Sequence, residues 1–279
     1  MPEGPEIKRA ADTISAAISG RKVEQIFFAF SHLKRYEVPL TGTWVTSVRS
    51  FGKAMLTTFS NGLSIYSHNQ LYGRWYCCLR GSLPTIQRQL RLAIHNRENS
   101  ALLYSASDIT VLNQEEAATH PFLGKLGPDT LAPETTRETI TCRLQDPRFR
   151  NRQLGRLLTD QSFVAGLGNY LRCEILFATG LSPRCRPGEL DNRMTERLAE
   201  MILALPRQSY ATGGITNQIS RARRMMQEGA SFEEARFLVF RREGKPCYRC
   251  GNAVRRELSG GQPTYLCPRC QQECRTEAR

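Results

Sequence analysis

The chain has 279 residues, 40% of them hydrophobic and 23% charged, which is typical of a folded globular protein and excludes a disordered one. No apolar run approaches the ~18 residues that cross a membrane, and the N-terminus lacks the apolar core of a signal peptide, so we expect a cytoplasmic protein without a membrane partner. The formal net charge is +13 and only six of the 39 basic residues are lysines, so a nucleic acid is the first partner to consider, beside the alternative of a basic protein that binds none.

One helix followed by short strands is predicted for residues 1–130. Pro5 suits the first turn of a helix, Gly20 suits its end, and the apolar residues between them keep helical spacing. The apolar period then changes to two, and Asn61-Gly62 and residues 96–99 are turn signals. These features predict a β-sandwich with the helix laid against it, and strands at residues 23–30, 44–51, 54–59, 63–67, 75–79, 90–95 and 101–105.

Beyond residue 130 the predicted elements are mainly helical. Helices are expected at residues 135–146, 152–160, 169–179 and 190–205, and a mobile loop at residues 212–235, where no apolar period stands out. Short strands are expected at residues 237–240 and 257–266, on either side of cysteine pairs. We therefore expect an α+β fold of three domains: a β-sandwich (1–130), a helical domain (131–236) and a small metal module (237–279).

Four cysteines near the C-terminus have the spacing of a zinc site. Two Cys-x-x-Cys pairs are separated by sixteen residues, and each pair places two thiolates on one side of a tight turn. Four thiolates fill a tetrahedral shell and leave no open position, so the single Zn²⁺ is predicted to be structural. The predicted ligands are Cys247, Cys250, Cys267 and Cys270. Cys274 is left as a spare thiol, interpreted as a surface cysteine.

A glycine-rich turn between two predicted helices is a candidate phosphate site. Asn169 is expected to cap the following helix, and Gly166 and Gly168 let backbone N–H groups approach a ligand closely. A plain capped turn would look the same. The arginines of the preceding segment favour a clamp on the nucleic-acid backbone; they are Arg148, Arg150, Arg152 and Arg156.

The N-terminus is a candidate nucleophile. Pro2 is small enough for Met1 to be removed, which would leave a free secondary amine directly before a helix. An α-amino group titrates near ~8 and lysine near ~10.4, so the terminal amine is the more available nucleophile at neutral pH. With an aldehyde it would form an iminium ion, an efficient electron sink for β-elimination, and the adjacent Glu3 can supply or take protons. Taken alone, Pro2 is also a common second residue.

Several separated motifs follow one another along the whole chain. They are MPEGPEI at the start, residues 51–54 (FGKA), residues 67–73 (SHNQLYG), residues 166–169 (GLGN) and the four-cysteine ribbon. In this order they resemble the formamidopyrimidine-DNA glycosylase/endonuclease VIII family. Gly4 and the segment Gln70-Leu71-Tyr72 are similar to the endonuclease VIII branch, whose preferred lesions are oxidised pyrimidines. The resemblance implies a bacterial-type, nucleoid-associated, monomeric enzyme with a helix–two-turn–helix domain, acting on double-stranded DNA with oxidised bases or abasic sites.

The resemblance also implies catalytic roles. In this family pattern Pro2 is the Schiff-base nucleophile that attacks C1′ and displaces the damaged base. Glu3 is the acid–base group, and Lys53 serves β-elimination and phosphate contact. The implied activity is that of a bifunctional DNA glycosylase/AP lyase of base excision repair, which nicks the strand by β- and in some members δ-elimination.

DNA contacts follow in the same way. Gln70, Leu71 and Tyr72 match the wedge that fills the gap left by a flipped-out nucleotide, and flipping is needed because stacked duplex hides C1′. Lys125 and Asn169 match phosphate contacts. Without the other motifs, the wedge segment would be interpreted as an ordinary hairpin and Lys53 as a solvated charge.

Two departures from the family pattern stand out. Five residues before the third zinc ligand the family carries a phosphate-binding arginine, and this chain has Gln262. The segment 212–235 is longer than the endonuclease VIII branch leads us to expect. Two alternatives therefore stay open: an oxidised-purine glycosylase of the formamidopyrimidine type, and a non-catalytic zinc-ribbon protein that binds nucleic acid.

Overall fold

The computed structural model describes residues 2–259 and 261–274. The chain forms two compact units with their boundary between Lys125 and Leu126, and each unit is described by itself. The expected helical domain and ribbon both fall in the second unit.

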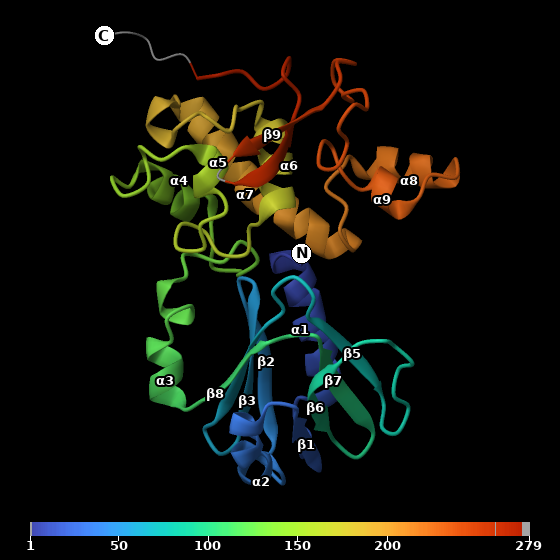
Figure 1. Ribbon diagram of the computed structural model, residues 1–279. Coiled ribbons are helices and arrows are strands. Elements are labelled where there is room, and N and C mark those ends of the chain that lie inside the picture. The colour runs from blue at the N-terminus through green and yellow to red at the C-terminus, as the bar shows by residue number, and fades with distance from the viewer. Residues whose placement is uncertain (1, 260, 275–279) are drawn as a thin grey trace. The chain divides into compact units, whose positions relative to one another are not determined.

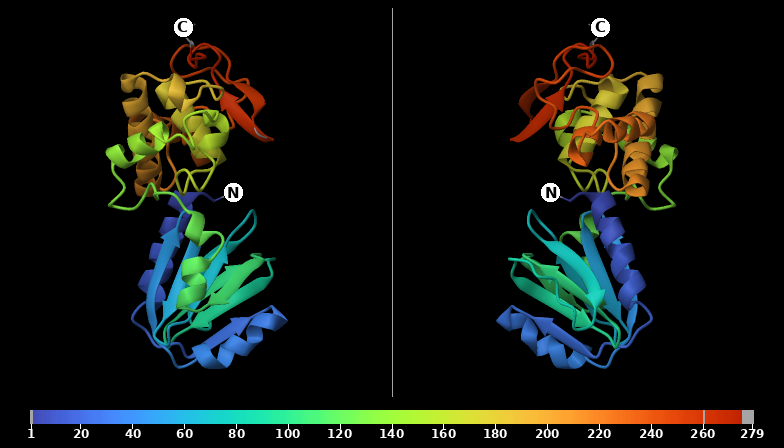
Figure 2. Two further views of the ribbon diagram at one scale, coloured as in Figure 1. Left: turned by 90° about the vertical axis from the view of Figure 1, so that its left-hand side faces the viewer. Right: turned by 90° about the vertical axis from the view of Figure 1, so that its right-hand side faces the viewer.

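The first unit begins with helix α1 (Gly4–Ile18), as predicted. Glu3 and Glu6 form a capping box at its start, in which each side chain accepts from the other residue's backbone N–H. One face of α1 is buried through residues at helical spacing, including Ile7, Ala11 and Ile14. The helix runs along the strands of the unit (Figures 1 and 2) and packs against both of its sheets.

The β-sandwich consists of two antiparallel four-stranded sheets. Their orders are β2-β3-β4-β8 and β1-β6-β7-β5. The inward side chains of both sheets and the apolar face of α1 form one core. The strands are β1 (Gln25–Phe28), β2 (Val45–Phe51), β3 (Ala54–Phe59), β4 (Ser64–His68), β5 (Arg74–Leu79), β6 (Leu90–His95), β7 (Asn99–Tyr104) and β8 (Asp108–Leu112).

The seven predicted strands are confirmed, with ends that differ by a few residues, and the turn signals fall at the β3–β4 and β6–β7 turns. Strand β8 was not predicted, because its five residues follow β7 closely. Short helical elements were missed as well: η1 (Ser31–Tyr36), α2 (Glu37–Leu40), α3 (Gln114–Thr119) and η2 (Leu123–Lys125).

The second unit is built around the long helix α7 (Asn192–Thr212), against which α4 (Arg137–Gln145) and α6 (Asn169–Thr179) pack. Helices α5 (Leu154–Leu157) and η3 (Pro187–Glu189) complete this core. Helix α7 continues beyond its predicted end, through a buried Pro206, to Gly213 in the left-handed conformation. Within the described residues, no helix is both long and apolar enough to cross a membrane.

The prediction of a mobile loop at residues 212–235 is wrong. The segment contains helices α8 (Ile219–Gln227) and α9 (Phe232–Ala235), which pack against each other. Only Ala222 of α8 is buried. The helical spacing of Ala222, Met225 and Met226, which pack in one small cluster, extends over too few residues to stand out among the arginines of the segment. The predicted strand at residues 237–240 is also absent; these residues form a turn. The ribbon hairpin follows as β9 (Arg255–Ser259) and β10 (Gln262–Leu266), and β10 lies beside α6 (Figure 1).

Candidate active site and zinc ribbon

The two N-terminal residues predicted to be catalytic lie directly before α1. Pro2 is half-buried, and Glu3 is only 2% exposed and stands at the N-cap in an extended conformation. The backbone N–H of Glu3 donates to the Glu6 carboxylate at 3.0 Å, which fixes the direction in which the chain enters the helix. A free amine on Pro2 would therefore be held beside a buried carboxylate.

Lys53 lies in the two-residue turn that joins β2 and β3. Gly52 precedes it with φ of 57°, a conformation that suits glycine at the first position of a tight hairpin turn. Burial lowers the pKa of Lys53, and the negative charge of Glu3 opposes that shift. Glu3 and Lys53 therefore interact, and the structure brings these two predicted catalytic residues together.

His68 and Asp108 belong to the same end of the sheet, and neither was predicted to be a site residue. Ala54, which follows Lys53, pairs with His68, and His68 pairs with Asp108 across the next strand. Burial lowers the pKa of His68, the Lys53 charge lowers it further, and Asp108 opposes both. His68 Nδ1 accepts from the Gln70 backbone N–H at 3.0 Å, so the neutral ring carries its proton on Nε2. The motif SHNQ, which contains His68, was the signal available in the sequence.

The predicted wedge forms the exposed connection from β4 to β5. Leu71 is 61% exposed and its neighbour Tyr72 is 71% exposed. Gly73 closes the loop by donating its N–H to the Asn69 carbonyl at 2.7 Å, and a Cβ on Gly73 would lie only 2.6 Å from that oxygen. The loop is therefore a tight turn that presents two apolar side chains to solvent.

Gln70 and Lys125 are the other predicted DNA contacts of the first unit. Gln70 has a positive φ of 50°, and its side-chain oxygen accepts from the Ser107 hydroxyl at 2.7 Å. Lys125 is exposed at the end of η2. Gln70 thus lies near the Lys53 end of the sheet through its bond to His68, whereas no hydrogen bond links Lys125 to Lys53 among the described residues.

Asn169 does not cap α6, so that prediction is wrong. The N-cap is Gly168, and Asn169 is the first helical residue. Its amide NH₂ donates to the Pro263 carbonyl at 2.9 Å, and its oxygen accepts from Arg172 at 2.5 Å. The side chain points to the ribbon because partners in β10 compete successfully with the capping position.

Arg172 connects α6 to the ribbon hairpin. The side chain is 1% exposed, and its guanidinium donates to the Gly155 carbonyl at 2.8 Å and the Thr264 hydroxyl at 2.7 Å. Longer contacts reach the carbonyls of Ser259 and Pro263. A buried arginine with these partners fixes β10 on the helical core.

Glu174, two residues further along α6, holds the turn that leads into the ribbon. It is fully buried, and its carboxylate accepts from the backbone N–H groups of residues 238–240 at 2.7 to 2.9 Å and from the Thr216 hydroxyl at 2.6 Å. Burial raises the pKa of Glu174, and these four donors oppose that shift. The sequence did not indicate this role.

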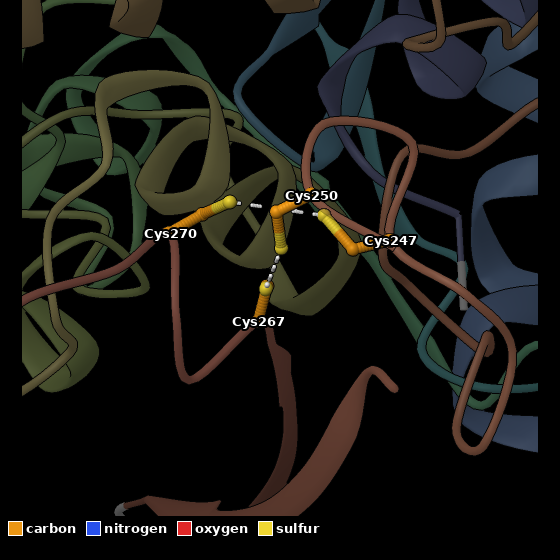
Figure 3. Close-up of side chains that lie close together, drawn as sticks. All are labelled: Cys247, Cys250, Cys267 and Cys270. Carbon is orange, nitrogen blue, oxygen red and sulfur yellow. Dashed lines mark hydrogen bonds between the residues drawn. The ribbon is translucent and has the colours of Figure 1, made fainter. Parts of the chain in front are cut away.

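The four predicted zinc ligands come together (Figure 3). Their sulfur atoms all lie within 4.8 Å of one another, and they are Cys247, Cys250, Cys267 and Cys270. Cys247 and Cys267 are buried, and the cluster packs on Cys173 and Phe177 of α6. Four thiols at this separation fit one structural zinc and leave no open coordination position for chemistry.

Cys274 is not a spare surface thiol, which corrects that interpretation. It pairs with the buried Cys185, with Cα atoms 5.4 Å apart. The pair joins the end of the ribbon segment to the connection between α6 and α7. The sequence could not show this pairing, because the two cysteines lie 89 residues apart.

Gln262, the residue at the family's arginine position, is the exposed first residue of β10 and pairs with Ser259. With Asn169 bonded to the next residue, both predicted contacts of the second unit lie at the same end of the hairpin.

Comparisons with known proteins match three successive parts of the chain. Family models match residues 1–107 (formamidopyrimidine-DNA glycosylase N-terminal domain), 126–221 (its H2TH domain) and 244–272 (zinc finger found in FPG and IleRS). Endonuclease 8 of Escherichia coli UMN026 is 48% identical over 271 residues, which is 97% of this chain and 100% of the relative. Endonuclease 8 of Salmonella enteritidis PT4 is 47% identical with the same coverage.

Solved structures share the fold. MutM in complex with carbocyclic 8-oxo-G containing DNA aligns with a TM-score of 0.79 at 18% identity, over 97% of this chain and 100% of that one. Lactococcus lactis Fpg in complex with DNA containing an abasic site aligns with a TM-score of 0.79 at 17% identity, over 97% of this chain and 99% of that one. The chain belongs to the formamidopyrimidine-DNA glycosylase/endonuclease VIII family, whose members are DNA glycosylases with AP lyase activity.

Proposed function

We propose that this protein removes oxidised pyrimidines from double-stranded DNA and nicks the resulting abasic site, with Pro2 as the nucleophile. The observation that carries the proposal is the buried Glu3 carboxylate at the start of α1, directly after Pro2, with the half-buried Lys53 within reach of its charge. A structural role alone would not require a buried carboxylate and a half-buried lysine next to the one secondary amine that the chain can expose.

The proposed reaction starts with attack of the Pro2 nitrogen on C1′. The N-glycosidic bond breaks, its electron pair leaves with the base, and Glu3 supplies a proton to the sugar ring oxygen or the base. The attacking nitrogen gives up its N–H proton, which goes to the other of these two groups, and opening of the sugar ring leaves an iminium ion between Pro2 and C1′. The C2′ proton is then lost to water, the electrons of that C–H bond form a C2′–C3′ double bond, and the 3′ phosphate leaves by β-elimination, with Lys53 as the proposed cation beside it. Water finally hydrolyses the iminium ion and releases the enzyme.

The wedge supports action on duplex DNA. Removing a nucleotide from the stack leaves a gap, and the exposed Leu71 and Tyr72 offer apolar surface to fill it, with Gln70 at the base of the loop. In the second unit, Asn169 and Gln262 are proposed contacts of the ribbon side, and Lys125 is a proposed phosphate contact of the first unit.

The trapping of a covalent intermediate tests the proposal. Incubation with abasic-site DNA and borohydride should give a stable adduct, and peptide mass spectrometry should place it on the peptide that begins with Pro2. The matched control is protein that retains Met1, which should give no adduct. Absence of an adduct from fully processed protein would refute the enzyme and favour the non-catalytic alternative.

Substrate preference is tested separately. Thymine glycol or 5-hydroxycytosine should be excised faster than 8-oxoguanine opposite cytosine, because the PEGPE start and the wedge are similar to the endonuclease VIII branch and curated Endonuclease 8 proteins are 47–48% identical. Comparable or reversed rates would favour the formamidopyrimidine alternative.

A further inference from the structure

A cavity of about 340 Å³ lies between α5 and the ribbon hairpin in the second unit. Its walls come from α5 and the residues after it, from α6 and from the facing ends of β9 and β10. They are Gly155, Arg156, Thr159, Arg172, Ser259 and Gln262. The lining thus contains two guanidinium groups, two hydroxyls and one amide, and it contains no acidic side chain.

One wall carries the buried positive charge of Arg172, which forms no ion pair with a carboxylate among the described residues. Arg172 is 1% exposed, and the partners found for it in the described chain are neutral: carbonyls, an amide oxygen and a hydroxyl. Its Nε has no hydrogen-bond partner among the described residues. Because an uncompensated buried charge is costly, the field of Arg172 favours a negative group in the adjoining space.

Arg156 is the exposed cation at the same cavity. Two arginines of the preceding segment are neutralised: Arg148 pairs with Asp146 at 2.6 Å and Arg152 with Asp160 at 2.7 Å. Arg156 has no such ion pair within residues 2–259 and 261–274, so its guanidinium is available to a ligand.

The shape of the cavity depends on a close approach of backbone. A Cβ on Gly155 would lie 2.6 Å from the Ser259 hydroxyl and 3.0 Å from Pro183, so the hairpin packs onto α5 where a glycine leaves room. Gln262 faces this space from the first position of β10 and can donate an N–H but supplies no charge.

We propose that this cavity binds a phosphodiester oxyanion of DNA and that Arg156 is the cation that holds it, with Gln262 as a neutral donor. The inference rests on the proposed function, because it names a phosphate-binding residue of the same DNA-binding protein. It assigns to α5 the charge that the hairpin position occupied by Gln262 does not provide.

The test measures binding to a duplex with a tetrahydrofuran abasic analogue at several salt concentrations. Arg156→Ala should weaken binding about tenfold, as expected for one solvent-accessible charge-assisted contact. The slope of log K against log salt should fall by about 0.9, the value for one phosphate contact. Arg156→Lys should keep the slope. The matched control is Arg193→Ala, since Arg193 is an exposed arginine of α7 outside the cavity, and it should change neither quantity.

A double variant separates charge from structure. Gln262→Arg in the Arg156→Ala background should restore the DNA affinity and the salt slope, because it returns a positive charge to the cavity. If Arg156→Ala weakened binding only by disturbing the local structure, the added arginine would restore neither quantity. Equal losses in Arg156→Ala and Arg193→Ala, or no loss in either, would overturn the proposal. A different result would also overturn it. If inorganic phosphate raised the Tm of wild type but not of Arg156→Ala, and both proteins bound DNA equally well, the cavity would be a site for free phosphate.

The borohydride adduct distinguishes the two proposals. It should form with wild type and with Arg193→Ala. Its absence from wild type would refute the enzyme, whereas its presence with unchanged binding by Arg156→Ala would refute only this site.

Discussion

Replacement of Arg172 by alanine should release the ribbon hairpin from the helical core. The side chain makes three short hydrogen bonds, to the Gly155 carbonyl at 2.8 Å, the Asn169 side chain at 2.5 Å and the Thr264 hydroxyl at 2.7 Å. At about 1.5–3 kcal/mol for each bond to a charged group, their sum of roughly 4.5–9 kcal/mol is an upper bound.

Two effects reduce this sum. Water can reach the freed acceptors once the hairpin moves, and the substitution removes a buried cation whose desolvation is unfavourable. We expect the free energy of unfolding of the second unit to fall by about 2–4 kcal/mol. With a urea m-value of about 2 kcal/mol/M, the midpoint of that transition should fall by roughly 1–2 M.

The chain allows the two units to be monitored separately. Both tryptophans, Trp44 and Trp75, lie in the first unit, whereas the long helices α6 and α7 lie in the second. Circular dichroism at 222 nm should therefore report the shifted transition while tryptophan fluorescence keeps its wild-type midpoint. Arg172→Met, which retains the aliphatic stem, is the matched control and should recover only the part of the loss that is due to packing.

Equal shifts of both probes would show that Arg172 supports the whole chain and not the ribbon alone. An unchanged dichroism midpoint would refute the reasoning outright, because it would mean that the three bonds contribute nothing beyond the cost of burying the charge.

Three other predictions concern the site and the ribbon. Glu3→Gln should abolish base excision but leave borohydride trapping of preformed abasic sites. Because the charge of Glu3 raises the pKa of Lys53, its removal should lower that pKa further and move the alkaline limb of the strand-nicking pH profile to lower pH. An unmoved limb would contradict the interaction between Glu3 and Lys53. Gly73→Ala should destabilise the wedge loop by about 1–3 kcal/mol, since its Cβ would lie 2.6 Å from the Asn69 carbonyl oxygen. The variant should excise a base from duplex DNA far more slowly than wild type but nick an abasic single strand at nearly the wild-type rate. Wild-type rates in both assays would show that the loop adapts. Chelation of zinc should weaken DNA binding and expose amides around the four cysteines to hydrogen exchange while tryptophan fluorescence stays native, and simultaneous unfolding of both units would contradict this expectation.

Local sequence patterns predict most of the helices and strands. The period-two strands, the turn at Asn61-Gly62 and the first helix follow from short-range rules, and the cysteine spacing alone predicted the ligand cluster. Helices α8 and α9 were missed because both are short and bury little. Helix α8 buries Ala222 alone, α9 begins at a Ser231 cap and buries only Ala235, and the contacts between the two helices cannot be identified from a local pattern.

Some residues of the candidate site can be identified from local motifs and others cannot. Pro2, Glu3 and Lys53 stand in recognisable motifs, whereas the contributions of His68 and Asp108 depend on strand register, which no short motif encodes. The partners of Arg172 and Glu174 come from segments far along the chain, so neither charge could be identified as buried from the sequence.

Three consecutive residues of α6 determine how the ribbon is held. Arg172 bonds to β10, Cys173 Sγ accepts from the Tyr265 backbone N–H at 3.4 Å, and Glu174 holds the turn at residues 238–240. These contacts fix the hairpin and the entry to the ribbon independently of the metal, whereas zinc closes the cysteine end. Loss of zinc should therefore loosen the cysteine turns first and leave β10 docked on α6. The cavity beside Arg156 would then survive chelation, and the fraction of DNA affinity that remains without zinc should still depend on Arg156.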